Sequence, residues 1–451
     1  MKLHSSTWFQ ENVMTTDRLL ADFSVKTTKN TFPSEGQYKG QRATFQRAMR
    51  LTLIVGQCFG LNPVLGICDT DSSKLRFTYC SGRCVYALIA IFGQTIFLNC
   101  FFLIKYFNES GTSVTSNSTL VFYASNTLTT ILFLRMAKKW PKLCQYIMKI
   151  EAADPVNDAT LVKKCNVSCI VILIMSILEH GLAEFAGFVM ASDCQPGKVY
   201  ESYVEHSFPW INLHVDYTFS LGFITQILNI LCTFNWNFGD IFIITISFYL
   251  TSRLEQVNKK IAAVRGKYVP TTFWRSVRED YNRATDLVRR VDEVIGSIIF
   301  LAFANNLVFI CMQLLHTFAN GIKAVPSCHN PDKRPLQGYE QALYFTYSFV
   351  FLVVRSLAVS LVAAQVHTAS RQPAYALYEV PSAVYCVEVQ RFIEQIHGDT
   401  VALTGLQFFK VKRGIVLAIA GTIVTYELVL LQFTGITPTV APLQDDLAYK
   451  D

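Results

Sequence analysis

Long apolar runs constrain this chain more than any other feature of its sequence. Seven of them lie at about residues 84–106, 119–134, 166–190, 213–250, 291–317, 341–367 and 413–435. A helix rises about 1.5 Å per residue and crosses a bilayer with about 20 residues. A backbone inside a bilayer must satisfy its own hydrogen bonds, so helices are the default. With 51% hydrophobic and only 16% charged residues, the chain is predicted to be an all-α membrane protein with seven transmembrane helices.

Two apolar segments do not fit a simple crossing. The run 213–250 is too long for one span, and its surplus, from Phe238 to Leu254, is predicted to continue as a helix into the cytoplasm. The segment 49–66 is short and broken by Gly and Pro, so we expect it to be re-entrant or interfacial within an N-terminal region 1–83. If it crosses instead, the chain has eight spans and its N-terminus lies outside. The first forty residues are polar, so the first span is expected to act as its own insertion signal.

The distribution of Lys and Arg gives the orientation. The loops on one side, including residues 1–83 and 251–290, hold 33 of these residues, and the loops on the other side hold 5. Cytoplasmic loops collect Lys and Arg, so the N-terminus is predicted to be cytoplasmic and the C-terminal tail, 436–451, extracellular. The net charge of +7 then reflects topology, and we expect no nucleic-acid partner.

Sequons and cysteines agree with this orientation. Asn108 and Asn117 begin N-x-Ser/Thr sequons in a loop without basic residues, and we expect glycosylation there. A third sequon, at Asn166, lies at the cytoplasmic edge and should stay unmodified. Cys194 and Cys328 lie in two different outside loops and could form a disulfide. The thirteen cysteines show no metal-ligand spacing, so no metal or cofactor is expected.

The cytoplasmic segments are predicted to be more than connectors. Residues 251–290 and 372–412 are charged and compatible with helices. Between Ser382 and Lys410, apolar residues such as Val389, Phe392 and Ile396 are interleaved with charged ones. We therefore expect a helical bundle beneath the six-helix unit 84–367, with 368–412 as an anchor helix that leads into the last span.

The last span carries a recognisable motif. Thr425-Tyr426 with Gln432-Phe433 resembles the TY…QF signature of insect gustatory receptors. Further stretches resemble the sugar-receptor clade of that family: Ala137-Lys138-Lys139-Trp140-Pro141, Glu179-His180, Cys232-Thr233-Phe234-Asn235-Trp236-Asn237 and Asn305-Asn306-Leu307. The resemblance covers most of the chain from Phe45 to Phe433.

This resemblance implies a sugar-gated, non-selective cation channel that acts as a sweet taste receptor. It implies a plasma-membrane protein that assembles as a homotetramer or with related subunits, and whose last helix lines a central pore for monovalent and divalent cations. Sugar would bind inside each subunit, in the outer half of the membrane bundle.

The sequence offers candidates for both sites. In the pore helix, Val429, Gln432, Phe433 and Ile436 share one face by i, i+3, i+4, i+7 spacing, where Gln432 could coordinate ions or only bond a neighbouring helix. Glu427 is off this face, and we expect it to pair with a basic residue. A sugar site needs polar groups and aromatic faces, and ionisable residues inside a membrane are functional candidates. The candidate pocket residues are Glu179, His180, Trp236, Asn305, Asn306, Tyr347 and Arg355.

Other interpretations of these residues stay open. Glu179 could pair with Arg355 only to hold helices together, and Asp240 is expected to have an anchoring role. A seven-helix G-protein-coupled receptor would have its N-terminus outside, contrary to the charge distribution. A secondary transporter would often show two related halves, and no such repeat is evident. No nucleophile elbow, metal cluster or phosphate loop indicates an enzyme.

Overall fold

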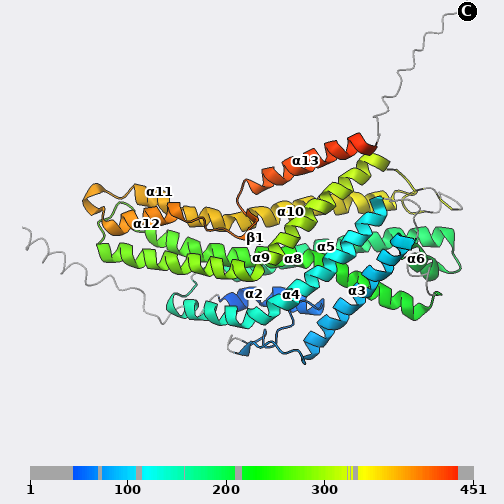
Figure 1. Ribbon diagram of the computed structural model, residues 1–451, viewed down its shortest axis with the longest axis horizontal. Helices are drawn as coiled ribbons and strands as arrows, with labels where there is room; N and C mark the ends of the chain where they lie inside the picture. Colours follow the sequence, from blue (N-terminus) through cyan, green and yellow to red (C-terminus); the bar gives the residue numbers. More distant parts are fainter. Residues whose placement is uncertain are drawn as a thin grey trace, which may run out of the picture. The chain divides into compact units, whose positions relative to one another are not determined.

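The chain folds into a bundle of long helices, which we describe from a computed structural model (Figure 1). The structure describes residues 44–69, 74–107, 114–156, 158–208, 216–321, 323–325, 327–328 and 334–434. Side chains at the ends of some helices are outside this description: 104–107, 114–117, 319–320 and 430–434.

Six helices of the described chain are long and apolar enough to cross a membrane. They are α3 (Gly82–Phe107), α4 (Val114–Ala153), α5 (Leu161–Cys194), α8 (Phe219–Ala262), α9 (Thr271–Asn320) and α10 (Glu340–Arg371). They coincide with the first six apolar runs. The seventh run forms α13 (Ile415–Thr434), whose described side chains extend only to Val429.

Helix α8 is the centre of the bundle. It packs against α2, α4, α5, α9 and α10, and nearly every residue between Leu231 and Val257 is buried. A helix that is apolar on all sides is stable only when neighbours surround it or lipid does. The helix runs unbroken from Phe219 to Ala262, so the surplus of the fourth apolar run does continue as helix.

Helix α4 is much longer than the apolar run 119–134. It continues through Pro141 to Ala153, well beyond the end of that apolar run. The reason is a second buried stripe, at Trp140, Leu143, Cys144, Ile147 and Ile150, which is packed into the main hydrophobic core. These positions recur at helical spacing. The helix therefore has one apolar face that packs on the core, although its other faces carry charged residues.

The segment 49–66 is largely helix α2 (Phe45–Cys58), with 14 residues. At about 1.5 Å per residue it is too short to cross a bilayer. Thr44 caps it, because its Oγ1 accepts the Arg47 amide at 3.3 Å. Its apolar face is buried against α5 and α8.

The segment 368–412 is not one helix. It contains the end of α10, then α11 (Pro373–Tyr378), a short 3-10 turn (Ser382–Val384) and α12 (Val387–Gly398). A hairpin of β1 (Thr404–Gly405) and β2 (Phe409–Lys410) follows. Asp292 of α9 holds the hairpin, since its carboxylate accepts the amide and the hydroxyl of Thr404 at 2.6 and 2.7 Å. No pattern in the sequence predicts this contact between distant segments.

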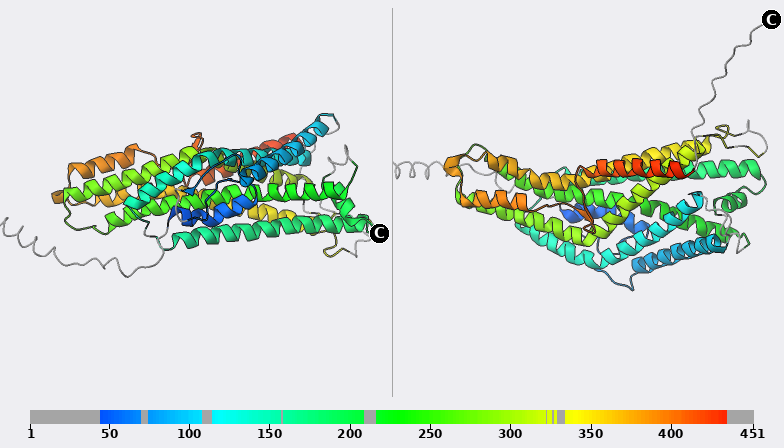
Figure 2. Two further views of the ribbon diagram at one scale, coloured as in Figure 1. Left: turned by 90° about the horizontal axis from the view of Figure 1, so that it is seen from below. Right: turned by 45° about the horizontal axis from the view of Figure 1, so that its top comes forward.

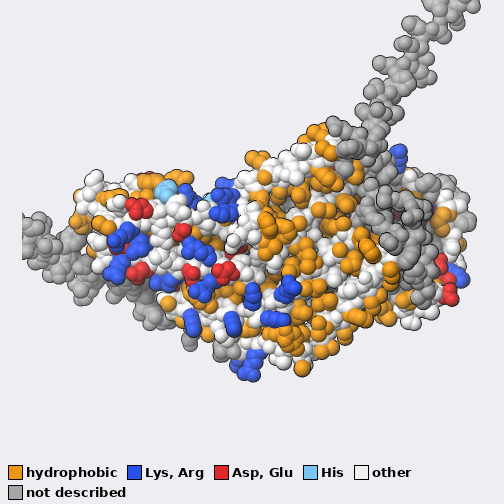
Figure 3. Space-filling model, in the orientation of Figure 1, with side chains coloured by type: hydrophobic (Ala, Val, Ile, Leu, Met, Phe, Trp, Pro, Cys, Tyr) orange, Lys and Arg blue, Asp and Glu red, His pale blue; other side chains and the backbone are white. Residues whose placement is uncertain are grey.

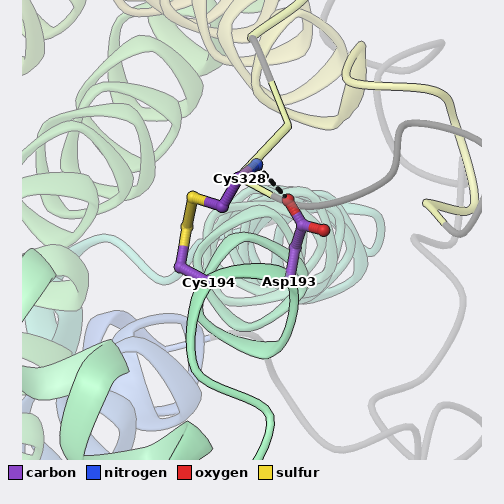
Figure 4. Close-up of side chains that lie close together, drawn as sticks. All are labelled: Asp193, Cys194 and Cys328. Atoms are coloured by element: carbon purple, nitrogen blue, oxygen red, sulfur yellow. Dashed lines mark hydrogen bonds between the residues drawn. A yellow bond between two sulfur atoms is a disulfide. The ribbon is translucent and has the colours of Figure 1, made fainter.

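A disulfide joins two connections at one end of the bundle. Cys194, the last residue of α5, is bonded to Cys328 in the segment between α9 and α10, across 134 residues (Figure 4). Beside it, Asp193 accepts the Cys328 amide at 2.8 Å and forms an ion pair with Arg334 at 2.8 Å. Both side chains of this pair are more than nine-tenths buried. The covalent and ionic links together fix the segment between α9 and α10 on the end of α5.

We expect removal of this disulfide to lower stability. A cross-link across 134 residues restricts the unfolded chain and is worth about 5 kcal/mol in the chain-entropy model, so the Cys194→Ser/Cys328→Ser protein should unfold at a lower temperature. Thermal unfolding of the purified full-length protein measures this. The control, Cys68→Ser/Cys80→Ser, changes two exposed free cysteines and should leave the midpoint unchanged. Equal midpoints for both double variants would contradict the expectation.

The contact between α2 and α8 gives a second prediction. A Cβ added at Gly56 would clash with Cζ of Phe238, a ring that is only 1% exposed. Gly56→Ala should therefore destabilise the protein by about 1–3 kcal/mol through overpacking. Gly181→Ala is the matched control, because no atom lies within 4 Å of its added Cβ and Ala favours the helix. A Gly56→Ala protein that melts like the Gly181→Ala protein would show that this contact is loose.

Candidate functional site

A cavity of about 1090 Å³ lies between the helices at the end of the bundle that carries the disulfide. Its walls come from α4, α5, α8, α9 and α10, and α6 (Val199–Ser207) and the connection 321–339 also line it. In Figure 1 this is the end where α6 lies, opposite α11 and α12. Large, partly enclosed spaces between the helices of a bundle are common ligand sites.

Four of the seven pocket candidates line this cavity: Glu179, His180, Trp236 and Arg355. Asn305, Asn306 and Tyr347 do not. Asn305 borders only a separate space of about 10 Å³, and the Tyr347 hydroxyl donates to the Met175 carbonyl at 3.1 Å. The difference is rotational, because these three side chains lie near the expected depth and their helices turn them elsewhere.

A buried ion pair underlies the cavity. Arg355 of α10 lies with Nε 2.8 Å from Oδ2 of Asp240 in α8, at an ion-pair distance without hydrogen-bond alignment. Both side chains are at most 3% exposed. Asn306 of α9 donates to both carboxylate oxygens of Asp240 at 3.2 Å. Asp240, Asn306 and Arg355 thus join α8, α9 and α10, and they agree with an anchoring role for Asp240.

Glu179 is not the partner of Arg355. Its carboxylate instead accepts the Ser348 hydroxyl of α10 at 2.6 Å. The sequence alone left the pairing of Glu179 with Arg355 open, because both lie at similar depth. Asp240 takes the guanidinium because α8 is the central helix and presents this carboxylate directly to α10.

A second cluster surrounds Glu184, one turn beyond His180 on α5. Its carboxylate accepts from the Tyr203 hydroxyl and from Gln226 Nε2, each at 2.6 Å, and lies 3.4 Å from His180 Nε2. The acidic groups of the cavity wall therefore already have partners within the protein. Glu340, the third of them, accepts the Leu336 amide at 2.8 Å.

Trp236 gives the cavity an aromatic wall. Its ring centroid lies 3.9 Å from that of Phe309 and 5.6 Å from that of Phe122. The guanidinium carbon of Arg355 lies 5.7 Å from the Trp236 ring. Such a ring offers an apolar face together with an indole N–H.

Sequence reasoning missed several cavity residues, above all Asn237, Gln313, His316 and Tyr344. Among the described residues, Asn237 Oδ1, Gln313 Oε1 and His316 Nδ1 are buried polar atoms without a hydrogen-bond partner, as is Trp236 Nε1. The spacing of polar residues on α9 could have identified part of this wall. Phe309, Gln313 and His316 follow i, i+4, i+7 spacing in an apolar helix, which places them on one face.

The pore candidates are described only in part. Val429 is 43% exposed on α13. Gln432 and Phe433 belong to the helix but their side chains lie outside the described residues, as do Ile436, Asn108 and the side chain of Asn117. Helix α13 packs on α9 and α10 through Ile415, Ile419 and Ile423.

Glu427 does not form the predicted ion pair with a basic residue among the described residues. It is 5% exposed, and neither carboxylate oxygen has a hydrogen-bond partner among the described residues. Glu427 lies on the face of α13 that also carries Ile423 and Ile419, one and two turns earlier. Helical geometry thus turns Glu427 toward the bundle, where no described basic group receives it.

Comparison with known proteins identifies the family. A family model described as "Trehalose receptor" matches residues 25–439. The Drosophila melanogaster gustatory receptor 5a for trehalose is 30% identical over 440 residues, which cover 96% of this chain and 93% of that protein. The gustatory receptor for sugar taste 64f from the same fly is 32% identical over 420 residues, or 90% and 83% of the two chains.

A solved structure shares the fold. The insect olfactory receptor OR5 from Machilis hrabei, in complex with eugenol, superimposes with a TM-score of 0.62 at 14% identity. The match covers 86% of this chain and 98% of that receptor. At this identity the similarity concerns the fold alone. From the family model and the two fly receptors, this multi-pass membrane protein belongs to the trehalose receptor family of gustatory receptors, which are receptors and not enzymes.

Proposed function

We propose that this protein is a sugar-gated, non-selective cation channel that acts as a sweet taste receptor in the plasma membrane. Sugar binds in the cavity at the α6 end of the bundle. The N-terminus is cytoplasmic, α13 is a seventh span, and four copies, or copies of related subunits, surround a central pore. The relatives named for trehalose and sugar taste support this class of ligand.

The proposal rests on the polar atoms of the cavity wall that have no hydrogen-bond partner within the protein. The carboxylates of Glu179, Glu184 and Glu340 accept hydrogen bonds from the protein, and Asp240 lies beside the Arg355 guanidinium. Apart from Arg355 Nε, which lies 2.8 Å from Asp240, the unpartnered buried atoms of the described wall are on the side chains of Asn237, Gln313, His316 and Trp236. A buried polar atom without a partner is costly, and the hydroxyls of a neutral sugar can both donate and accept.

The same wall suits the apolar face of a sugar ring. Trp236 presents an aromatic surface among the polar groups, and aromatic faces with a few placed polar atoms are typical of small-molecule sites. The orientation from the Lys and Arg distribution puts this end outside, where dissolved sugar arrives. Asn108 and Asn117 would be glycosylated on the same side.

The proposed gating depends on two helices that line the cavity and also contact α13. A ligand opens a channel only by binding the open state better than the closed one. Helices α9 and α10 line the cavity and also pack against α13. We infer that sugar draws these two helices together, that α13 shifts with them, and that the constriction at Val429, Gln432 and Phe433 widens.

The cavity is tested by replacing an amide with an apolar side chain of the same length. Gln313→Met keeps the unbranched shape but removes hydrogen bonds worth about 1–1.5 kcal/mol, so the sugar concentration for half-maximal current should rise about tenfold. The control is Asn305→Leu, which also replaces an amide with an apolar side chain of similar shape, on the same helix but outside the large cavity, and which should alter this concentration less than about twofold. The measurement is a trehalose and sucrose dose-response in cells that express the chain. The site is misplaced if Asn305→Leu causes the larger shift.

The pore is tested separately. In a four-fold assembly Gln432 would form a ring of four amides that passing cations contact. Gln432→Ala should then change the relative permeability of sodium, potassium and calcium without moving the sugar dose-response. Leu417→Ala, at the other end of α13 and 77% exposed, is the control and should leave permeability unchanged. Identical permeability ratios in the wild type and in Gln432→Ala would exclude this ring from the conduction path.

A further inference from the structure

A band of basic side chains lies on α4 and next to the start of α3. On α4 it comprises Arg135, Lys138, Lys139 and Lys142, all exposed, at i, i+3, i+4, i+7 spacing on one helix face. Arg76 and Arg83, also exposed, lie in the chain just before and at the start of α3. We call these six residues the basic band. Lys138 links the two parts, since its Nζ lies 4.9 Å from the ring centroid of Tyr79.

Unlike the other basic residues of the charged end, the basic band has no acidic partner among the residues that the structure describes. On α8, α9 and α12, residues such as Arg253, Lys260, Arg278 and Arg289 form ion pairs with Asp or Glu. Within the part of the chain that the structure describes, none of the six band residues does so. Figure 3 shows this contrast, with Lys and Arg alone at the edge of the hydrophobic surface over α4, and alternating with Asp and Glu further from it.

The band lies at the boundary of the lipid-facing surface. Helix α3 exposes an apolar face that begins two residues after Arg83 and includes Val85, Leu88, Ile89 and Phe92. In a membrane protein such a face meets lipid tails. Arg83 lies only about 8 Å from Leu88 along the helix, so the band is at the depth of lipid headgroups. Tyr79, 55% exposed, is an aromatic residue at the same level, where Tyr is enriched.

We propose that the basic band binds the phosphorylated headgroups of anionic phospholipids in the cytoplasmic leaflet. Clusters of four to eight Lys and Arg beside a transmembrane helix attract such headgroups, and that leaflet holds the anionic lipids. The unpaired cations supply the charge, Tyr79 and the α3 face supply contact with the lipid body, and the orientation from the Lys and Arg distribution places the band on this side. The site is independent of sugar binding, since no band residue lines the cavity.

The test measures lipid binding by the purified full-length protein in detergent. Short-chain phosphatidylinositol bisphosphate, phosphatidylserine and phosphatidylcholine are titrated, and the melting temperature reports binding, because a ligand of the native state raises it. We expect the bisphosphate lipid to act at the lowest concentration and phosphatidylcholine to have no effect. Lys138→Gln/Lys142→Gln should raise the half-saturating concentration of the bisphosphate lipid roughly 25-fold, at about fivefold per charge.

The control variant removes the same charge elsewhere. Lys259→Gln/Lys267→Gln changes two exposed residues, one in the last turn of α8 and one five residues after its end, neither in an ion pair among the described residues, and should leave lipid binding unchanged. If the band variant does not fold, the wild type still decides, because its binding must weaken with added salt and follow headgroup charge. Three results would overturn the proposal: equal effects of phosphatidylcholine, equal losses in both variants, or equally tight binding of free inositol trisphosphate.

Discussion

The ion pair between Asp240 and Arg355 organises the centre of this receptor. Two charges at most 3% exposed must compensate each other, because an unpaired buried charge would cost several kcal/mol. Removing one partner of such a pair typically costs about 3–5 kcal/mol. The pair ties the central helix α8 to α10, and Asn306 adds α9. The cavity forms on one side of this junction, so its floor is a fixed polar cluster on three helices.

The apolar parts of the long helices were predictable from the sequence, but their extensions beyond the apolar region were not. The apolar runs identified six long helices, because spans of a bilayer need length and low polarity. Where helices leave the apolar region the sequence pattern was weaker. Helix α4 extends to Ala153 because Trp140 and Ile147 face the core. The exposed lysines of this segment lower its mean hydropathy, so a hydropathy profile does not reveal the buried face.

The hydrogen-bond and ion-pair partners of the site residues were harder to predict than the depth of these residues along their helices. Glu179, His180, Trp236 and Arg355 do line one cavity, yet Glu179 bonds Ser348 and Arg355 pairs with Asp240. Depth along a helix follows from counting residues, but rotation depends on how neighbouring helices pack. The hairpin at Thr404 is a similar case, since Asp292, more than a hundred residues away, holds it in place.

The unbroken length of α9 has a mechanical consequence. Its 50 residues extend about 75 Å, from Thr271, near the ion pairs of the charged end, to the cavity wall at Gln313 and His316. The helix bends near its middle, close to the hairpin, as Figure 1 and the right-hand view of Figure 2 show, so it has two arms and is not one straight rod. A change of about 5° in the angle between the arms would move a point about 30 Å along one arm by roughly 2–3 Å. A small change at the cavity would then become a larger displacement at the charged end, which lies on the longer arm.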